Sequence, residues 1–225
     1  MGMNSRDNPA EIRIRPRDAL IVVDMQNDFM PGGALPVREG DEIVSGVNGV
    51  MRKFHDSGMP VILTQDWHPR GHRSFASAYA GRTPFDLHEE PGIGPVLWPD
   101  HCVQGSRGAD FHRDLTTHLA QAIVRKGFRQ GVDSYSAFLE NDRTTVTGLE
   151  GYLRDRGVER IFVCGLALDY CVFYTACDGV DLGYEAVLLL DLARPVGSPP
   201  GSAGRALDTM RSKGVLVVRS EAVVR

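Results

Sequence analysis

The sequence predicts an α/β fold, a three-layer α/β/α domain built on a six-stranded parallel sheet. Six short runs rich in apolar and β-branched residues recur along the 225-residue chain. Their near-continuous apolarity is typical of parallel strands that are covered on both faces. Amphipathic stretches lie between several of these runs, and alternating strands and helices build an open parallel sheet with helices on its faces.

The expected strands are, in chain order, residues 19–24 (ALIVVD), 60–65 (PVILTQ), 122–126 (AIVRK), 160–165 (RIFVCG), 186–191 (AVLLLD) and 215–219 (VLVVR). The expected helices lie near residues 41–57, 147–156, 169–182 and 202–213. A glycine stands at the end of each helix, where a left-handed C-terminal cap favours that residue. These glycines are Gly58, Gly157, Gly183 and Gly214.

Residues 66–109 interrupt this alternation. They show little periodicity, and they contain many prolines and glycines and four of the seven histidines. An irregular segment of this length inside a compact domain is usually functional or disordered. The concentration of histidine favours function.

Composition narrows the class of protein. With a formal net charge of −4 and no basic stripe, the chain is not expected to bind nucleic acid or a membrane. Residues 1–17 are interpreted as an N-terminal extension before one domain, residues 18–225. The start of the chain has no apolar core of signal-peptide length, so a cytoplasmic location is expected. The four cysteines form no CxxC pair and are interpreted as free thiols.

Chemistry-bearing residues follow four of the expected strands. Ligands of an open parallel sheet bind beyond the carboxyl ends of its strands. The first strand ends at Asp24, the second leads into Asp66 and His68, the third ends at Lys126, and the fourth leads into Cys171. An acid, a pair of possible metal ligands, a base and a thiol are therefore expected on one rim of the sheet.

Cys171 is the candidate nucleophile. It is expected in the first turn of a helix, where the helix dipole and a nearby Lys126 ammonium would lower the thiol pKa below its usual value of about 8.5. The alternative is an inert buried thiol, which is the interpretation given to Cys164 and Cys177. Asp24 either caps the turn after its strand or acts as a general base for the thiol. Lys126 has a functional role only if its ammonium points inward between Asp24 and Cys171.

A metal site is expected beside this group. Asp66 and His68 are two residues apart, so in an extended segment both side chains leave the same face. His101, in the segment LWPDHCVQGS, is a third candidate ligand. Asp, His and His with open positions describe a catalytic divalent site for zinc, iron or manganese. His72 adds either a fourth ligand or only a hydrogen bond. No role is assigned to the remaining histidines, His55, His88, His112 and His118.

Together these segments resemble the nicotinamidase (pyrazinamidase) branch of the isochorismatase-like cysteine hydrolases. The resemblance runs from DMQNDFMPGGALPV through TQDWHPRGHRSFAS, VLWPDHCVQGS, KGFRQGVDSYSAF and GLALDYCV to DLARPV. DWHP followed by WPDHCVQGS is specific for the metal-bearing nicotinamidases. Leu168 departs from the pattern, because the family commonly has threonine there.

The resemblance implies a role for each matched position. The catalytic residues would be Asp24, Lys126 and Cys171, and the metal ligands Asp66, His68 and His101. The substrate pocket would be lined by Phe29, Trp98 and Tyr135. The backbone N–H groups of Ala167 and Cys171 would form the oxyanion hole, beside a peptide bond that is usually cis. The bound metal would be one divalent ion, with zinc as the first expectation and iron or manganese as alternatives.

The implied activity is hydrolysis of nicotinamide to nicotinate and ammonia through a cysteine thioester, as part of NAD salvage, with pyrazinamide as a further substrate. Two alternatives stay open: another small-amide or ester hydrolase of the same fold, and a thiol redox protein. A catalytically inactive metal-binding module is a third, disfavoured because every matched functional position is intact. The expected partner is a small-molecule substrate. Family members often associate, so a homo-oligomer is also open.

Overall fold

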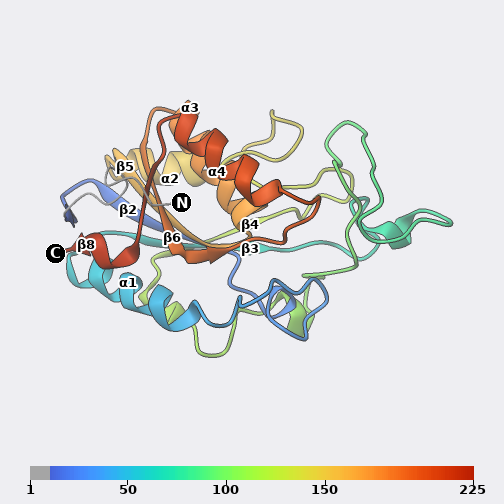
Figure 1. Cartoon of the computed structure of the whole chain (residues 1–225), viewed down its shortest axis with the longest axis horizontal. Helices are drawn as coiled ribbons and strands as arrows, with labels where there is room; N and C mark the ends of the chain where they lie inside the picture. Colours follow the sequence, from blue (N-terminus) through green and yellow to red (C-terminus); the bar gives the residue numbers. More distant parts are fainter. Residues whose placement is uncertain (1–10) are drawn as a thin grey trace, which may run out of the picture.

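A six-stranded parallel sheet forms the centre of the computed structural model, which describes residues 11–225 (Figure 1). The strand order is β4-β3-β2-β5-β6-β7, and every neighbouring pair is parallel. The strands are β2 (Asp18–Val23), β3 (Val61–Asp66), β4 (Ala122–Lys126), β5 (Arg160–Leu166), β6 (Glu185–Arg194) and β7 (Leu216–Val218). The predicted fold class, with six parallel strands, is therefore confirmed.

Helices cover both faces of the sheet (Figure 1). On one face lies α1 (Val44–Asp56), and on the other lie α2 (Leu149–Asp155), α3 (Phe173–Asp181) and α4 (Ser202–Ser212). This division follows from right-handed crossovers, because the path from β2 to β3 and the path from β5 to β7 run in opposite directions across the sheet. All four predicted helices are present. The four glycines that follow them have positive φ angles, as a left-handed cap requires.

Two features differ from the expectation. β4 is an edge strand whose Ile123 is 52% exposed, so coverage on both faces was the wrong prediction for this strand. A second, two-stranded sheet pairs β1 (Ile12–Arg13) with β8 (Val223–Val224), and strands of two residues carry no periodicity that could predict them. Of the predicted N-terminal extension, residues 1–10 lie outside the described residues.

The segment between β3 and β4 is irregular, as predicted. Its helical content consists of three 3₁₀ turns of three residues each, Ala76–Ala78, Arg107–Ala109 and Thr117–Leu119. Isolated bridges pair Phe75 with Trp98 and His68 with Val103, so the segment folds back on itself. In Figure 1 its green part extends past one end of the sheet.

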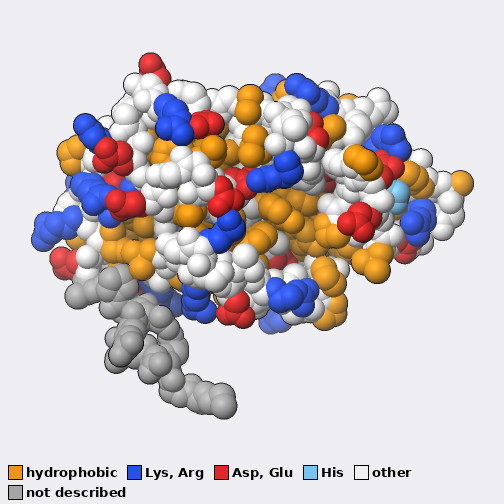
Figure 2. Space-filling view, turned by 90° about the horizontal axis from the view of Figure 1, so that it is seen from above, with side chains coloured by type: hydrophobic (Ala, Val, Ile, Leu, Met, Phe, Trp, Pro, Cys, Tyr) orange, Lys and Arg blue, Asp and Glu red, His pale blue; other side chains and the backbone are white. Residues whose placement is uncertain are grey.

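The surface carries mixed charge. On the face drawn in Figure 2, basic and acidic side chains are interspersed and no continuous basic stripe is visible. Within residues 11–225, no helix combines the length and the apolarity needed to cross a membrane.

Candidate active site and metal centre

The candidate residues meet at the edge of the sheet where the order of the strands reverses, between β2 and β5. From the central pair β2 and β5, the chain continues to β3 and β4 on one side and to β6 and β7 on the other. Such a switch point is the usual ligand site of an open α/β sheet. Asp24 follows β2, Asp66 and Lys126 are register partners at the ends of β3 and β4, and Cys171 follows β5. The structure therefore brings all four predicted strand ends to one edge.

Lys126 points inward and is completely buried. Its Nζ lies 2.8 Å from Asp24 Oδ2 and 3.3 Å from Cys171 Sγ. It also forms an ion pair with Asp66 Oδ1 and donates a hydrogen bond of 2.9 Å to the carbonyl oxygen of Ser134. Burial lowers the pKa of Lys126, but the two carboxylates outweigh burial and raise it well above its usual value. The side chain is thus held as an ammonium between the acid and the thiol.

Asp24 is positioned by Thr64 on the neighbouring strand. The Thr64 hydroxyl donates to Asp24 Oδ1 at 2.6 Å and accepts the Asp24 backbone N–H at 3.1 Å. Burial raises the pKa of Asp24, whereas Lys126 and Thr64 act in the opposite direction. The net result is a raised pKa, which suits a carboxylate that exchanges a proton during a reaction.

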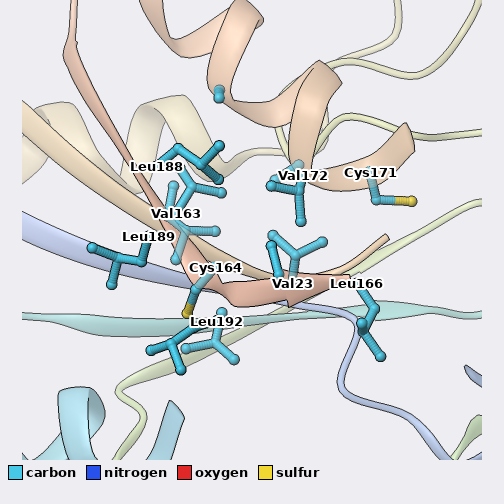
Figure 3. Close-up of a cluster of buried hydrophobic side chains, with 14 of the residues drawn as sticks. Val23, Val163, Cys164, Leu166, Cys171, Val172, Leu188, Leu189 and Leu192 are labelled. Atoms are coloured by element: carbon cyan, nitrogen blue, oxygen red, sulfur yellow. The ribbon is translucent and has the colours of Figure 1, made fainter. Parts of the chain in front are cut away.

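Cys171 lies in a tight turn between β5 and α3. The Leu166–Ala167 peptide bond is cis, as the resemblance implies, and a π-helical turn, Leu168–Val172, leads into α3. Figure 3 shows the Cys171 sulfur projecting away from the apolar cluster, beyond the end of the strand. In the same view the Cys164 sulfur lies inside the cluster near Leu192, which agrees with the interpretation of Cys164 as a core residue.

The pKa of Cys171 is raised, not lowered as the sequence predicted. Burial is the largest effect, and it raises the pKa well above the usual value. Lys126 lowers it, but Asp24 and Asp66 raise it again. The prediction counted the ammonium and omitted burial and the two carboxylates. The resting group is therefore a thiol, and its sulfur lies within 4.8 Å of carboxylate oxygens of Asp24 and Asp66.

Asp66, His68 and His101 converge on the other side of Lys126. Asp66 Oδ2 lies 3.6 Å from His68 Nε2 and 3.9 Å from His101 Nε2. The Nδ1 atom of His68 is 2.9 Å from the carbonyl oxygen of Gly127, and that of His101 is 2.8 Å from the carbonyl oxygen of Pro99. A carbonyl only accepts, so each Nδ1 carries a proton and each Nε2 presents a lone pair. Two such nitrogens and one carboxylate oxygen fit a divalent cation.

The surroundings of the two histidines support this fit. Burial and the neighbouring His68 lower the pKa of His101 to about 4, so its ring is neutral, as a metal ligand must be. Burial lowers the pKa of His68 while Asp66 raises it, with a net rise, so a proton competes with a cation for His68 Nε2, which faces Asp66. Gly127, with φ 65°, allows the close approach, because a Cβ there would lie 2.5 Å from the His68 ring.

His72 packs against this site without offering it a ligand. Its Nε2 faces two backbone carbonyls, of Arg129 at 2.8 Å and Val132 at 3.1 Å, and therefore carries a proton. Its Nδ1 accepts the backbone N–H of Ser74 at 3.2 Å and lies 2.7 Å from the Ser74 hydroxyl. Both ring nitrogens are occupied, so of the two alternatives for His72 the structure favours the hydrogen bond.

A small pocket with a cavity volume of about 20 Å³, partly open to solvent, joins the thiol to the candidate metal ligands Asp66 and His101. The predicted Phe29, Trp98, Tyr135 and Ala167 all line it. Trp98 Nε1 donates to the Tyr135 hydroxyl at 3.1 Å, and that hydroxyl donates to the carbonyl oxygen of Gly94 at 2.8 Å, which fixes both rings. The sequence did not single out the other lining residues Leu35, Asp133, Tyr170 and Val196.

Gln26 is a second group that the sequence analysis missed. Its side-chain amide accepts the Asp66 N–H and donates to the Asp66 carbonyl, both at 2.8 Å. It also donates to the carbonyl oxygen of Ala109 at 2.9 Å. These bonds hold the backbone of a metal-ligand candidate. A buried amide directly after an apolar strand was the available signal.

This chain is similar to known proteins over most of its length. The isochorismatase domain family matches residues 18–222. The nicotinamidase of Acinetobacter baylyi is 42% identical over 216 residues, covering 95% of this chain and 99% of that protein. The structure of PnC1 from L. infantum in complex with nicotinate superposes with a TM-score of 0.82 at 38% identity, covering 95% of this chain and 98% of that chain.

A zinc-containing relative extends the comparison to the metal. The pyrazinamidase of Pyrococcus horikoshii in complex with zinc has a TM-score of 0.75 at 41% identity, covering 91% of this chain and 99% of that chain. The family match spans the whole sheet and every residue of the site. The chain therefore belongs to the isochorismatase family.

Proposed function

We propose that this chain is a nicotinamidase, which hydrolyses nicotinamide to nicotinate and ammonia in NAD salvage and also accepts pyrazinamide. One observation carries the proposal: Cys171, whose thiol contacts a buried ammonium, lines the same aromatic pocket as Asp66 and His101 of a donor set for a divalent cation. A thiol suits attack on a carboxamide carbon. A cation beside an aromatic pocket suits a substrate whose ring carries a nitrogen lone pair.

The reaction would begin with proton transfer within the buried triad. Asp24 takes the proton of the Cys171 thiol as the sulfur attacks the carboxamide carbon. Lys126 stabilises the negative charge on the carboxylate before the transfer and on the sulfur during it, since its Nζ contacts both groups. The backbone N–H groups of Ala167 and Cys171 would hold the oxyanion, where each such donor contributes about 3–4 kcal/mol in acyl-transfer enzymes.

The second half of the reaction returns the proton. Asp24 donates it to the departing nitrogen, ammonia leaves, and the acyl group remains on the sulfur as a thioester. Asp24, again a carboxylate, takes a proton from the water that attacks the thioester. The C–S bond then breaks, nicotinate leaves, and Asp24 returns the proton to the Cys171 sulfur. The raised pKa of Asp24 brings its proton affinity closer to what both steps require.

Asp66, His68 and His101 would hold the cation, because their donor atoms lie within 4.8 Å of one another and the histidine lone pairs face the carboxylate. We propose zinc as the ion, since two imidazoles and one carboxylate are among its common ligand sets. When bound, the ion supplies a Lewis-acidic contact for the ring nitrogen of the substrate.

The test compares two amides that differ at one ring atom. Nicotinamide should release ammonia and nicotinate in equal amounts, whereas benzamide, which lacks the ring nitrogen, should be hydrolysed far more slowly. Equal turnover of both amides would contradict a role for the ring nitrogen. No release from nicotinamide by the metal-loaded, reduced protein would instead favour a different small amide or ester as the substrate.

A further inference from the structure

Asp133 is a buried carboxylate in the pocket for which the proposed reaction has no use. It is 2% exposed and lies on the segment that follows β4. Its Oδ1 accepts the backbone N–H of Ser134 at 2.9 Å. Its Oδ2 is buried and has no hydrogen-bond partner among residues 11–225. A buried carboxylate oxygen without a partner is costly, so a missing group is expected to satisfy it.

The position of Asp133 shows where that group would be. It lines the same pocket as Asp66 and His101. Its carboxylate and one ring nitrogen each of His68 and His72 lie within 4.8 Å of one another. The Asp133 carboxylate thus lies on the side of the pocket that holds the candidate metal ligands.

Asp133 is too far away to be a direct ligand of the same cation. Its carboxylate does not come within 4.8 Å of the donor atoms of all three residues Asp66, His68 and His101. Atoms that bind one cation at about 2.0–2.2 Å are at most about 4.4 Å apart. A water molecule on the cation would span the remaining distance and supply the missing hydrogen bond.

We propose that Asp133 is a positioning residue of the metal site, with Oδ2 accepting a hydrogen bond from a water ligand of the cation. This inference rests on the divalent site of the proposed function. Electrostatics points the same way: the carboxylates of Asp66 and Asp133 line one pocket, and a divalent cation between them would compensate their charge.

The test uses the full-length, metal-free protein and Zn²⁺ alone, titrated in competition with a chromophoric chelator. Asp133→Asn keeps an oxygen for the Ser134 N–H but loses the charge and the second acceptor. We expect Zn²⁺ to bind this variant about 10- to 100-fold more weakly, as is typical when a partner of a metal ligand is removed. Asp18→Asn is the matched control, since Asp18 is equally buried but pairs with Arg160 at the start of β2. Its Zn²⁺ affinity should be unchanged.

Asp133→Glu separates positioning from a structural role. If Asp133 had only a structural role in the turn, the isosteric Asn should leave the Zn²⁺ affinity unchanged and the longer Glu should lower it. The proposal predicts the reverse order, with Glu binding Zn²⁺ more tightly than Asn because it retains the carboxylate. Wild-type affinity in Asp133→Asn, or weaker binding by Glu than by Asn, would overturn it. Since no substrate is used, these outcomes do not depend on whether nicotinamide is hydrolysed.

Discussion

Asp66 and Lys126 form a buried ion pair that joins the thiol half of the site to the metal half. Asp66 contacts the ammonium through Oδ1 and faces His68 and His101 through Oδ2. The same ammonium contacts Asp24 and Cys171. One carboxylate therefore takes part in both charge networks. A substitution that changes the charge of one half should therefore alter the electrostatics of the other.

The nucleophile is tested by Cys171→Ala. Amide hydrolysis should be lost, with kcat lowered by about 10⁴-fold or more, because removal of a nucleophile leaves only binding and oxyanion stabilisation. Cys177→Ala, which removes a thiol from α3, is the control and should keep its turnover. Both variants should retain the far-ultraviolet circular dichroism of the parent. Substantial turnover by Cys171→Ala would show that another group attacks the substrate.

The buried ammonium is tested by Lys126→Met in metal-free protein. The substitution leaves Asp24 and Asp66 buried without their counter-charge, and breaking a buried ion pair in this way costs about 3–5 kcal/mol. Urea unfolding measures the loss. Adding Asp24→Asn should recover part of it, because a neutral amide does not need the ammonium. If the two substitutions are strictly additive, Asp24 and Lys126 are not coupled as described.

The general base is tested by Thr64→Val through the pH dependence of kcat/KM. Asp24 acts as a base only when ionised, so activity should fall as the pH drops through its pKa, which burial raises above the ordinary aspartate value. The Thr64 hydroxyl stabilises the ionised form, since it donates to Asp24 Oδ1. Its removal should raise that pKa further and move the acid limb to higher pH. An unmoved limb in Thr64→Val would argue against Asp24 as the base.

A matched control for that experiment lies on α3. Thr175 is as buried as Thr64, but its hydroxyl accepts the backbone N–H of Ala137. Thr175→Val should leave the acid limb where it is in the parent protein. A shift of the same size in both variants would mean that the limb responds to general destabilisation instead of to Asp24.

The metal ligands are tested by His101→Ala, which removes one of the two Nε2 lone pairs. The purified variant should contain little divalent metal by elemental analysis, and the KM for nicotinamide should rise. His118→Ala, in the 3₁₀ turn Thr117–Leu119, is the control and should retain its metal. Full metal occupancy in His101→Ala would show that the ligand set is wrong.

The fold could be predicted from sequence because its signals are local. A buried parallel strand is a run of apolar residues, and a helix end is a glycine with positive φ, as at Gly58 and Gly183. The parallel direction of the strands then places their carboxyl ends, and hence Asp24 and Cys171, on one edge. Edge exposure at Ile123 could not be predicted, because strand order depends on long-range contacts.

The site could be predicted only in outline. The position at a strand end singled out Lys126, but the raised pKa of Cys171 depends first on burial of the thiol itself and then on three charged neighbours. The supporting groups Thr64 and Gln26 lie within or beside apolar strands, where a polar side chain has no distinctive spacing. The contacts of His72 Nε2 likewise depend on carbonyl groups about 60 residues away in the chain.

Nicotinate release from nicotinamide, measured before and after chelation of the purified, reduced protein, tests the central claim most directly. If the thiol and the metal site act on one substrate, turnover should be lost on chelation and restored by adding a divalent ion. Turnover that persists unchanged in the metal-free protein would contradict the account, because the donor set of Asp66, His68 and His101 would then have no part in the reaction.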